Sequence, residues 1–297
     1  MKKNLILGIV DNYNYFRIER FFKSLAKTQF DGHVCLFIGP GTDASVSVNL
    51  KKAGVEMILY RNEFPYIENP HPLNLKTLPN PIHIWNFRHF LYYDYLLKNE
   101  GKFKNVMLSD IKDVIFQEDP FDFQINNKLY VAMERQSIAD CEWTSKWIVN
   151  GYDDSVLNDI ENQIVSCAGT TLGPVDRIKA YLHDLLVEIQ QLKDAYTCAD
   201  QAAHNVLLHS GKLDPVIKVN NESGLIMTVG SLDDVQFLFD NEGYLTNSAG
   251  KRVNIIHQAD RRVELLKQLD KFIFEKPFYL AVAKTIYDKV RHLVKKG

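Results

Sequence analysis

Residues 5–39, LILGIVDNYNYFRIERFFKSLAKTQFDGHVCLFIG, contain two short apolar runs on either side of an amphipathic one. The apolar runs at 5–10 and 33–39 have the length and composition of buried strands. Between them, Phe16, Phe21 and Leu25 recur at the spacing of one helix face, which predicts a helix over 15–29. A strand, a helix and a second strand in this order predict two parallel strands joined by a crossover helix.

The same alternation continues toward the middle of the chain. A third strand is expected at 56–60, after a helix that Gly54 ends, and a strong helix over 84–102 leads into an apolar strand at 105–108. Five prolines between residues 64 and 81 predict a long loop there. This alternation predicts an α/β fold with a mixed, mainly parallel sheet flanked by helices. We expect one domain over 1–262 and a helical extension over 263–297.

Composition and charge argue against several classes of protein. With 35 basic against 37 acidic residues the chain is nearly neutral, so we expect no nucleic-acid partner. The four cysteines form no C-x-x-C pair, which argues against a zinc site or a dense disulfide framework and favours a reducing compartment. The apolar run at 5–10 is too short for the core of a signal peptide, and no run of about 18 apolar residues exists to span a membrane. We therefore expect a cytoplasmic protein.

Two acidic residues follow the strand at 105–108, in the segment NVMLSDIKDVIFQEDPF. In open parallel sheets, ligands bind at the carboxyl ends of strands, where Asp110 is expected to lie. Asp113 can reach the same site only if the chain turns at Ile111 and Lys112. Two carboxylates on a turn suit Mg²⁺ or Mn²⁺, which take oxygen ligands and keep positions open for phosphate. The alternative is that Asp110 caps a turn and Asp113 pairs with a basic side chain on the surface.

Three further segments and the helix before the acids complete a pattern of motifs. The helix is WNFRHFLYYDYLL (85–97) with Arg88, and the later segments are IVSCAGTTLGP (164–174) with Gly169, YTCADQAAHNVLL (196–208) with Asp200 and Gln201, and VNIIHQADRR (253–262) with His257. The three later segments also have ordinary interpretations, as a plain strand and turn, a helix N-cap at Asp200, and a hydrogen-bonding histidine. In this order they resemble the retaining, metal-dependent glycosyltransferases of the GT-A fold, which include glycogenin and bacterial lipopolysaccharide galactosyltransferases.

The resemblance covers roughly residues 4–262 and implies a GT-A-like, Rossmann-like domain with a metal site. Asp110, Asp113 and His257 are the implied ligands of Mn²⁺ or Mg²⁺. The group usually has D-x-D where this chain has D-x-x-D, so which aspartate is the direct ligand stays open. The implied nucleotide-sugar contacts are Asp11, Asn12, Tyr15, Arg88, Asp110 and Gly169. For Asp11, Asn12 and Tyr15 a polar loop before a helix is an equally good interpretation.

The activity that the resemblance implies is transfer of a hexose from a nucleotide-sugar to a saccharide or glycolipid acceptor. A UDP-sugar is the expected donor, and retention of the anomeric configuration is the expected outcome. Gln201 and Asp200 are the implied catalytic residues, since an amide or an acid near C1 stabilises an oxocarbenium-like transition state. The loops expected at 64–81 and 136–160 are candidates for acceptor contacts. The alternative is a non-catalytic nucleotide- or carbohydrate-binding protein on the same scaffold.

The last segment, KPFYLAVAKTIYDKVRHLVKKG (276–297), has apolar residues at near-helical spacing and a basic end. A basic amphipathic helix can lie on the inner face of a membrane, which would suit a lipid-linked acceptor. The alternative is a packed terminal helix with a solvated end.

Overall fold

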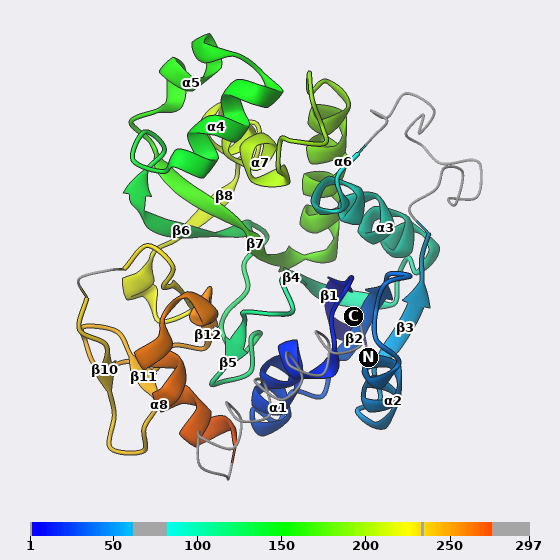
Figure 1. The fold of residues 1–297 in the computed structure, drawn as a ribbon, viewed down its shortest axis with the longest axis vertical. Helices are drawn as coiled ribbons and strands as arrows, with labels where there is room; N and C mark the ends of the chain where they lie inside the picture. Colours follow the sequence, from blue (N-terminus) through cyan, green and yellow to red (C-terminus); the bar gives the residue numbers. More distant parts are fainter. Residues whose placement is uncertain (1, 62–81, 233–234, 275–297) are drawn as a thin grey trace, which may run out of the picture.

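The computed structural model describes residues 2–61, 82–232 and 235–274, which form an α/β fold (Figure 1). The strands, in chain order, are β1 (Lys3–Val10), β2 (His33–Ile38), β3 (Glu56–Leu59), β4 (Phe103–Ser109), β5 (Ile115–Phe116), β6 (Leu129–Ser137), β7 (Ile164–Pro174), β8 (Val216–Val219), β9 (Ile226–Thr228), β10 (Leu238–Phe239), β11 (Leu245–Thr246) and β12 (Ile255–His257). The α-helices are α1 (Glu19–Lys27), α2 (Ala44–Lys52), α3 (Ile84–Lys98), α4 (Glu142–Gly151), α5 (Asp154–Ile160), α6 (Val175–Gln190), α7 (Asp200–His209) and α8 (Val263–Ile273). Short 3₁₀ helices are η1 (Tyr15–Arg17), η3 (Asn221–Ser223) and η4 (Ala259–Arg261).

Seven of these strands form a large sheet in the order β3-β2-β1-β4-β7-β6-β8. The strands β3, β2, β1 and β4 are parallel to one another, and β6 is parallel to β8. Only β7 among the seven runs antiparallel to its neighbours β4 and β6. The predicted α/β class, with a mixed and mainly parallel sheet flanked by helices, is confirmed and is compatible with a Rossmann-like fold.

The two faces of the large sheet are buried by different helices. On β1, Leu5 and Leu7 pack with residues of α3, α6 and α7, whereas Ile6 and Val10 pack with residues of α1 and α2. Successive side chains of a strand point to opposite faces, so both faces of β1 need apolar residues. Figure 1 shows α3 and α1 on opposite sides of this part of the sheet. Burial on both faces explains why the sequence shows an unbroken apolar run here.

A second, smaller sheet has the order β5-β12-β9. Its strand β12 is antiparallel to β5 and parallel to β9. With α8 it encloses a separate small core in which Ile115, Ile256 and Leu269 are buried. Asp270 on α8 accepts hydrogen bonds from Arg20 Nε and Nη2 on α1, at 2.7 and 2.8 Å. The first part of the predicted helical extension therefore packs against the domain.

The loop predictions have mixed outcomes. The expectation of a loop at 136–160 is wrong, because α4 and α5 occupy most of that span. Asp153 starts α5 by accepting hydrogen bonds from the backbone N–H groups of Ser155 and Val156. On α4, the side chain of Ile148 is fully buried. The loop expected at 64–81 and the membrane-contacting helix expected at 276–297 lie outside the described residues. Within the described part of the chain, no helix combines the length and apolarity needed to cross a membrane.

Candidate metal centre

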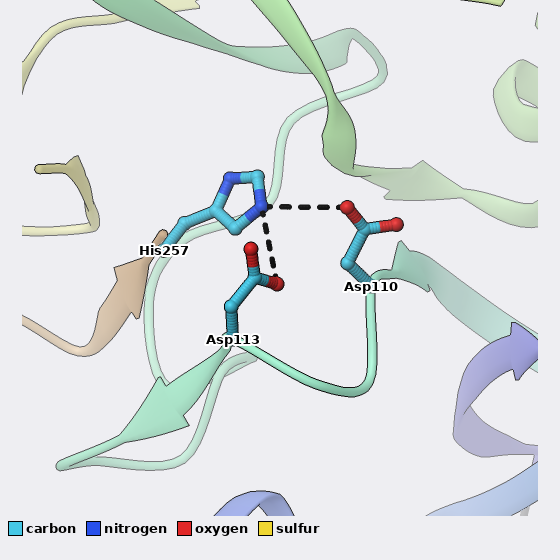
Figure 2. A group of neighbouring side chains, drawn as sticks. All are labelled: Asp110, Asp113 and His257. Atoms are coloured by element: carbon cyan, nitrogen blue, oxygen red, sulfur yellow. Dashed lines mark ion pairs between the residues drawn. The ribbon is translucent and has the colours of Figure 1, made fainter. Parts of the chain in front are cut away.

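Three predicted residues meet where the large sheet adjoins the small one (Figure 2). Asp110 follows the last residue of β4, and Asp113 precedes β5 by two residues. The chain bends at Ile111 and Lys112 between them, as the metal hypothesis required. His257 is the last residue of β12, whose antiparallel pairing with β5 brings the imidazole beside Asp113. Strand pairing thus joins residues that are far apart in the sequence.

The side chains of this group have the spacing of ligands around one cation. His257 Nε2 lies 3.6 Å from Asp110 Oδ2 and 3.8 Å from Asp113 Oδ1. One ligand atom from each residue lies within 4.8 Å of the other two. These distances are too long for hydrogen bonds, and they leave room for an ion between the side chains. His257 Nε2 is buried and has no hydrogen-bond partner among the described residues, although it is aimed at two carboxylates.

The donor set fits a divalent cation. Two carboxylates and an imidazole supply oxygen and nitrogen ligands, and the opposite ring atom, His257 Nδ1, lies 3.5 Å from Thr170 Oγ1. A hydrogen bond at the second ring nitrogen is the usual way in which a protein orients a metal-binding histidine. The backbone of His257 is held as well, because its carbonyl accepts a hydrogen bond of 3.0 Å from the N–H of Val229.

The surroundings shift the pKa values of the two carboxyl groups in opposite directions. Burial raises the pKa of Asp113 to about 6, and the charge of Asp110 adds to this effect. Burial also raises the pKa of Asp110, but the nearby Arg88 and His257 outweigh it and hold that pKa well below its usual range. Burial lowers the pKa of His257, but Cys167 and the two aspartates more than reverse the effect. A positive charge is therefore favoured between the aspartates.

Gly169 lies against this group, on β7. Its carbonyl accepts a hydrogen bond of 2.8 Å from the N–H of Asp110. A Cβ at Gly169 would lie 2.5 Å from both Asp110 Oδ2 and His257 Cε1, closer than such atoms approach. The sequence predicted that Gly169 permits a close approach of ligand to backbone, and the structure shows a close approach of the candidate metal ligands.

Arg88 on α3 connects Asp110 to Asp200 on α7. Arg88 Nη1 donates to Asp110 Oδ1 at 2.5 Å, while Nη2 and Nε donate to Asp200 Oδ2 at 2.7 and 3.1 Å. His89 Nε2 lies 2.7 Å from the same Oδ2 atom. Burial raises the pKa of Asp200, but Arg88 and His89 lower it to about 2 overall. The N-cap interpretation of Asp200 is wrong, because Ala199 occupies the cap position and the Asp200 carboxylate turns inward to Arg88.

A cavity of about 250 Å³ connects these residues. Six predicted site residues line it: Arg88, Asp110, Asp113, Gly169, Asp200 and Gln201. Gln201 Nε2 donates a hydrogen bond of 2.9 Å to Thr144 Oγ1 on α4, which fixes the amide at the cavity wall. His257 is almost completely buried, with 1% of its side chain exposed, and is not among the residues that line the cavity.

The predicted nucleotide contacts after β1 are placed differently. Among the described residues, Tyr13 belongs to the cavity lining, whereas Asp11, Asn12 and Tyr15 do not. Asp11 instead accepts a hydrogen bond of 3.0 Å from the amide of its neighbour Asn12. Arg17 lies over the Tyr13 ring, with its guanidinium carbon 4.8 Å from the ring centroid. A one-residue difference in a polar loop decides which side chain faces the cavity, and the sequence contains no signal that fixes it.

Other lining residues were not predicted as site residues. Trp85 and Arg261 stand in two of the quoted motif segments and Trp147 in none, but all three belong to the lining. Lys112 also lines the cavity, and its Nζ lies 2.5 Å from Asp260 Oδ2. The cavity therefore has basic side chains beside its acidic centre, an arrangement that can hold an anionic ligand through both a cation and direct charges.

No protein-family model matches the chain, and no curated protein sequence is significantly similar to it. Sequence comparison thus neither assigns nor contradicts the family that the motifs resemble.

Proposed function

We propose that this protein is a metal-dependent glycosyltransferase that moves a hexose from a nucleotide-sugar to a saccharide or glycolipid acceptor. The observation that carries the proposal is the cluster of Asp110, Asp113 and His257, whose two aspartates line one cavity together with Asp200 and Gln201. A cation site can stabilise the nucleoside diphosphate as it leaves the sugar, and a fixed acid and amide beside it can stabilise the sugar itself.

Asp110, Asp113 and His257 would hold the cation. Of the two expected ions, Mn²⁺ suits this set better, because Mg²⁺ strongly prefers oxygen ligands and one ligand here is an imidazole. When bound, the cation would neutralise negative charge that develops on the diphosphate as the bond to the anomeric carbon breaks. Arg88 fixes the orientation of Asp110 through its hydrogen bond. Arg261 supplies further positive charge at the cavity wall, whereas Lys112 there is paired with Asp260.

Asp200 and Gln201 are the residues proposed to contact the sugar. The hydrogen bonds that Asp200 receives from Arg88 and His89 all end on Oδ2, which leaves Oδ1 for a sugar hydroxyl. Gln201 uses Nε2 to bind Thr144, which leaves its carbonyl Oε1 as the atom that can stabilise positive charge at C1. The buried Arg88 pair keeps Asp200 ionised at neutral pH. Retention of configuration is proposed on the motif resemblance.

A turnover panel tests the proposal. UDP-, GDP- and dTDP-hexoses are incubated with Mn²⁺ or with chelator, with and without mixed saccharide acceptors, and released nucleoside diphosphate is measured. We expect Mn²⁺-dependent release from one nucleotide-sugar and at least about a hundredfold loss in Gln201→Ala, which corresponds to roughly 2.7 kcal/mol of transition-state stabilisation. The exposed residue Asp122, in the turn after β5, provides the matched control Asp122→Asn.

Two results contradict the proposal. Binding of a nucleotide-sugar without release, even with acceptors present, identifies a non-catalytic binding protein. Release that persists in chelator and in Gln201→Ala shows that the chemistry occurs elsewhere or in a contaminant.

A further inference from the structure

The three tryptophans of the chain lie together on the surface. Trp85 is the second residue of α3, while Trp143 and Trp147 are one turn apart on α4. The ring centroids of Trp85 and Trp147 are 6.3 Å apart, and those of Trp143 and Trp147 are 6.0 Å apart. We call these three residues the tryptophan patch. Tyr196 extends it, because His83 contacts both Trp85 and Tyr196, with centroid distances of 4.3 and 5.8 Å.

Most of this aromatic surface is exposed, although Trp147 is half-buried and packs against the main core. Trp143 is 63% exposed, Tyr196 53% and Trp85 46%. Large aromatic side chains normally contribute their apolar area to a core or to an interface. A contiguous exposed group of them therefore indicates a binding surface.

The patch continues into the candidate active site. Trp85 and Trp147 line the same cavity as Asp110 and Gln201. Thr144, which lies on α4 between the two tryptophans of that helix, is buried and accepts the hydrogen bond from Gln201. The position of α4, and with it Trp143 and Trp147, is thus fixed relative to the amide proposed to act at C1.

We infer that the tryptophan patch is the acceptor subsite and that its ligand is a saccharide of at least two sugar rings. This inference rests on the proposed transferase function. A sugar ring has an apolar face of C–H groups and a polar rim of hydroxyls, so it can stack on an indole ring while its hydroxyls stay in water or bind polar neighbours. Glu142 and Lys146, exposed on α4, and Asn150, near its end, supply such polar neighbours.

The spacing of the rings supports a ligand longer than one sugar. Trp147, at the cavity wall, would stack on the ring that receives the hexose. Trp143 lies outside the cavity lining, one helical turn away, and would stack on the next ring. Rigid aromatic side chains lose little conformational freedom on binding, which suits a site that must hold an acceptor without enclosing it.

Intrinsic fluorescence tests the inference directly, because the patch contains every tryptophan in the chain. Lactose, cellobiose, maltose and N,N′-diacetylchitobiose are titrated into the protein in the absence of nucleotide. We expect at least one of them to change the tryptophan emission in a saturable way. Trp143→Ala should weaken that binding by about tenfold, whereas Trp143→Phe should restore most of it, since a phenyl ring keeps a stacking face. Leu59→Ala, at a 69% exposed apolar residue of β3, is the matched surface control and should change nothing.

Kinetics give the second measurement. With the saccharide found by fluorescence as acceptor, Trp143→Ala should raise the acceptor KM about tenfold more than it raises the donor KM. No emission change with any of the four disaccharides would overturn the inference. A saturable change caused by UDP alone would overturn it as well, because the patch would then bind the nucleotide. A change in emission caused only by phosphatidylglycerol vesicles would also overturn the inference, because it would identify a lipid surface as the ligand.

Failure of the proposed function would give a different pattern. If no nucleotide-sugar is turned over but a disaccharide still changes the emission, the transferase proposal fails and the patch remains a saccharide-binding surface. If turnover is normal and the patch variants alter neither emission nor acceptor KM, only the acceptor assignment fails.

Discussion

The spacing of Asp110 and His257 depends on a residue without a side chain. Gly169 lies so close to both that an added Cβ would occupy the space between them. The neighbouring strand β4 cannot move away, because Asp110 is hydrogen bonded to the carbonyl of Gly169. A methyl group at this position would therefore displace the side chains of the metal centre.

We predict that Gly169→Ala lowers Mn²⁺ affinity by at least about tenfold, roughly 1.4 kcal/mol, while the protein stays folded. Gly173→Ala is the matched control in the same strand, since a Cβ there would meet Lys128 O at 3.0 Å, a tight contact remote from the centre. Isothermal titration calorimetry measures the affinity, and circular dichroism checks the fold. Equal affinity in wild type and Gly169→Ala would contradict the geometry described.

The carboxylate of Asp113, a candidate metal ligand, destabilises the folded protein when no metal is bound. Its carboxylate is 3.8 Å from His257 Nε2, too far for a hydrogen bond, and burial raises its pKa to about 6. A carboxyl group whose pKa is higher in the folded state destabilises that state once pH rises above its unfolded value near 4. The destabilisation is complete above pH of about 6 and is present at neutral pH.

We predict that Asp113→Asn stabilises the metal-free protein at pH 7.5 by about 1–3 kcal/mol. Urea denaturation in the presence of chelator measures the free energy of unfolding of both proteins. The gain should vanish near pH 4, where the wild-type carboxyl group is protonated in the folded state. A loss of stability at pH 7.5 would mean that Asp113 has a structural role.

At the scale of elements, Arg88 holds three parts of the fold together. It lies on α3, and its guanidinium bridges Asp110 after β4 and Asp200 at the start of α7. The Arg88 and Asp200 side chains are only 8% and 6% exposed, so each charge is compensated by the other rather than by water. Removing one partner of a buried pair leaves the other charge without compensation.

We predict that Arg88→Met lowers the free energy of unfolding by about 3–5 kcal/mol. Lys193→Met is the control, because Lys193 and its partner Asp153 are 63% and 51% exposed and such surface pairs contribute little. Chemical denaturation at neutral pH compares the two variants with wild type. Similar small effects in both variants would show that the Arg88 bridge is not a structural tie.

The elements differ in how well their sequences predict them. The core strands β1, β2 and β4 and the long helix α3 have continuous apolar runs or strong helical periodicity, so this part of the fold could be predicted, whereas β6 and β8 of the same sheet were not. The strands β5 and β12 contain two and three residues, too few for any period to appear. The span at 136–160 contains two short helices, and its polar composition resembled a loop. The secondary structure of these segments depends on tertiary contacts, such as the burial of Ile148.

At the scale of the whole molecule, a buried polar network supports the wall of the site. His204 on α7 lies 2.9 Å from Tyr181 OH on α6 and 2.8 Å from Ser166 Oγ on β7. Asn205 also binds the backbone of Ser166 through its Oδ1 and Nδ2 atoms, both at 2.8 Å. Burial lowers the pKa of His204 to about 3, so the imidazole is neutral in the folded protein.

We predict that acid weakens the fold through this histidine. The unfolded chain binds a proton at His204 below pH of about 6.5, whereas the folded protein does so only near 3, so stability is lost as pH falls between these values. From pH 7 to pH 5 the loss attributable to His204 is about 2 kcal/mol. His204→Gln stays neutral and should lack this part of the pH dependence. Denaturation curves at the two pH values test this, and equal pH dependence in both proteins would contradict it.

The assembly of the candidate site could be predicted only in part. Strand geometry placed Asp110 at the end of β4, and turn geometry gave the condition under which Asp113 reaches the same site, but the sequence left a surface ion pair as the alternative. His257 entered through the motif resemblance, because no local pattern shows that β12 pairs beside β5. Acceptor contacts were expected from 136–160, which contains Trp143 and Trp147, but neither the grouping of the tryptophans nor the role of Tyr13 could be predicted. Their positions depend on how α3, α4 and the loop after β1 pack around the cavity.

The most direct test of a metal-dependent centre is a Mn²⁺ titration of the metal-free protein followed by electron paramagnetic resonance. We predict that wild type and Asp122→Asn bind a single Mn²⁺ per chain, and that Asp113→Asn and His257→Gln each lose at least about tenfold in affinity, since each replaced residue supplies one ligand. Asp113→Asn should remain fully folded in this experiment, which separates lost binding from lost structure. Equal Mn²⁺ affinity in Asp113→Asn and wild type would contradict the assignment of the centre.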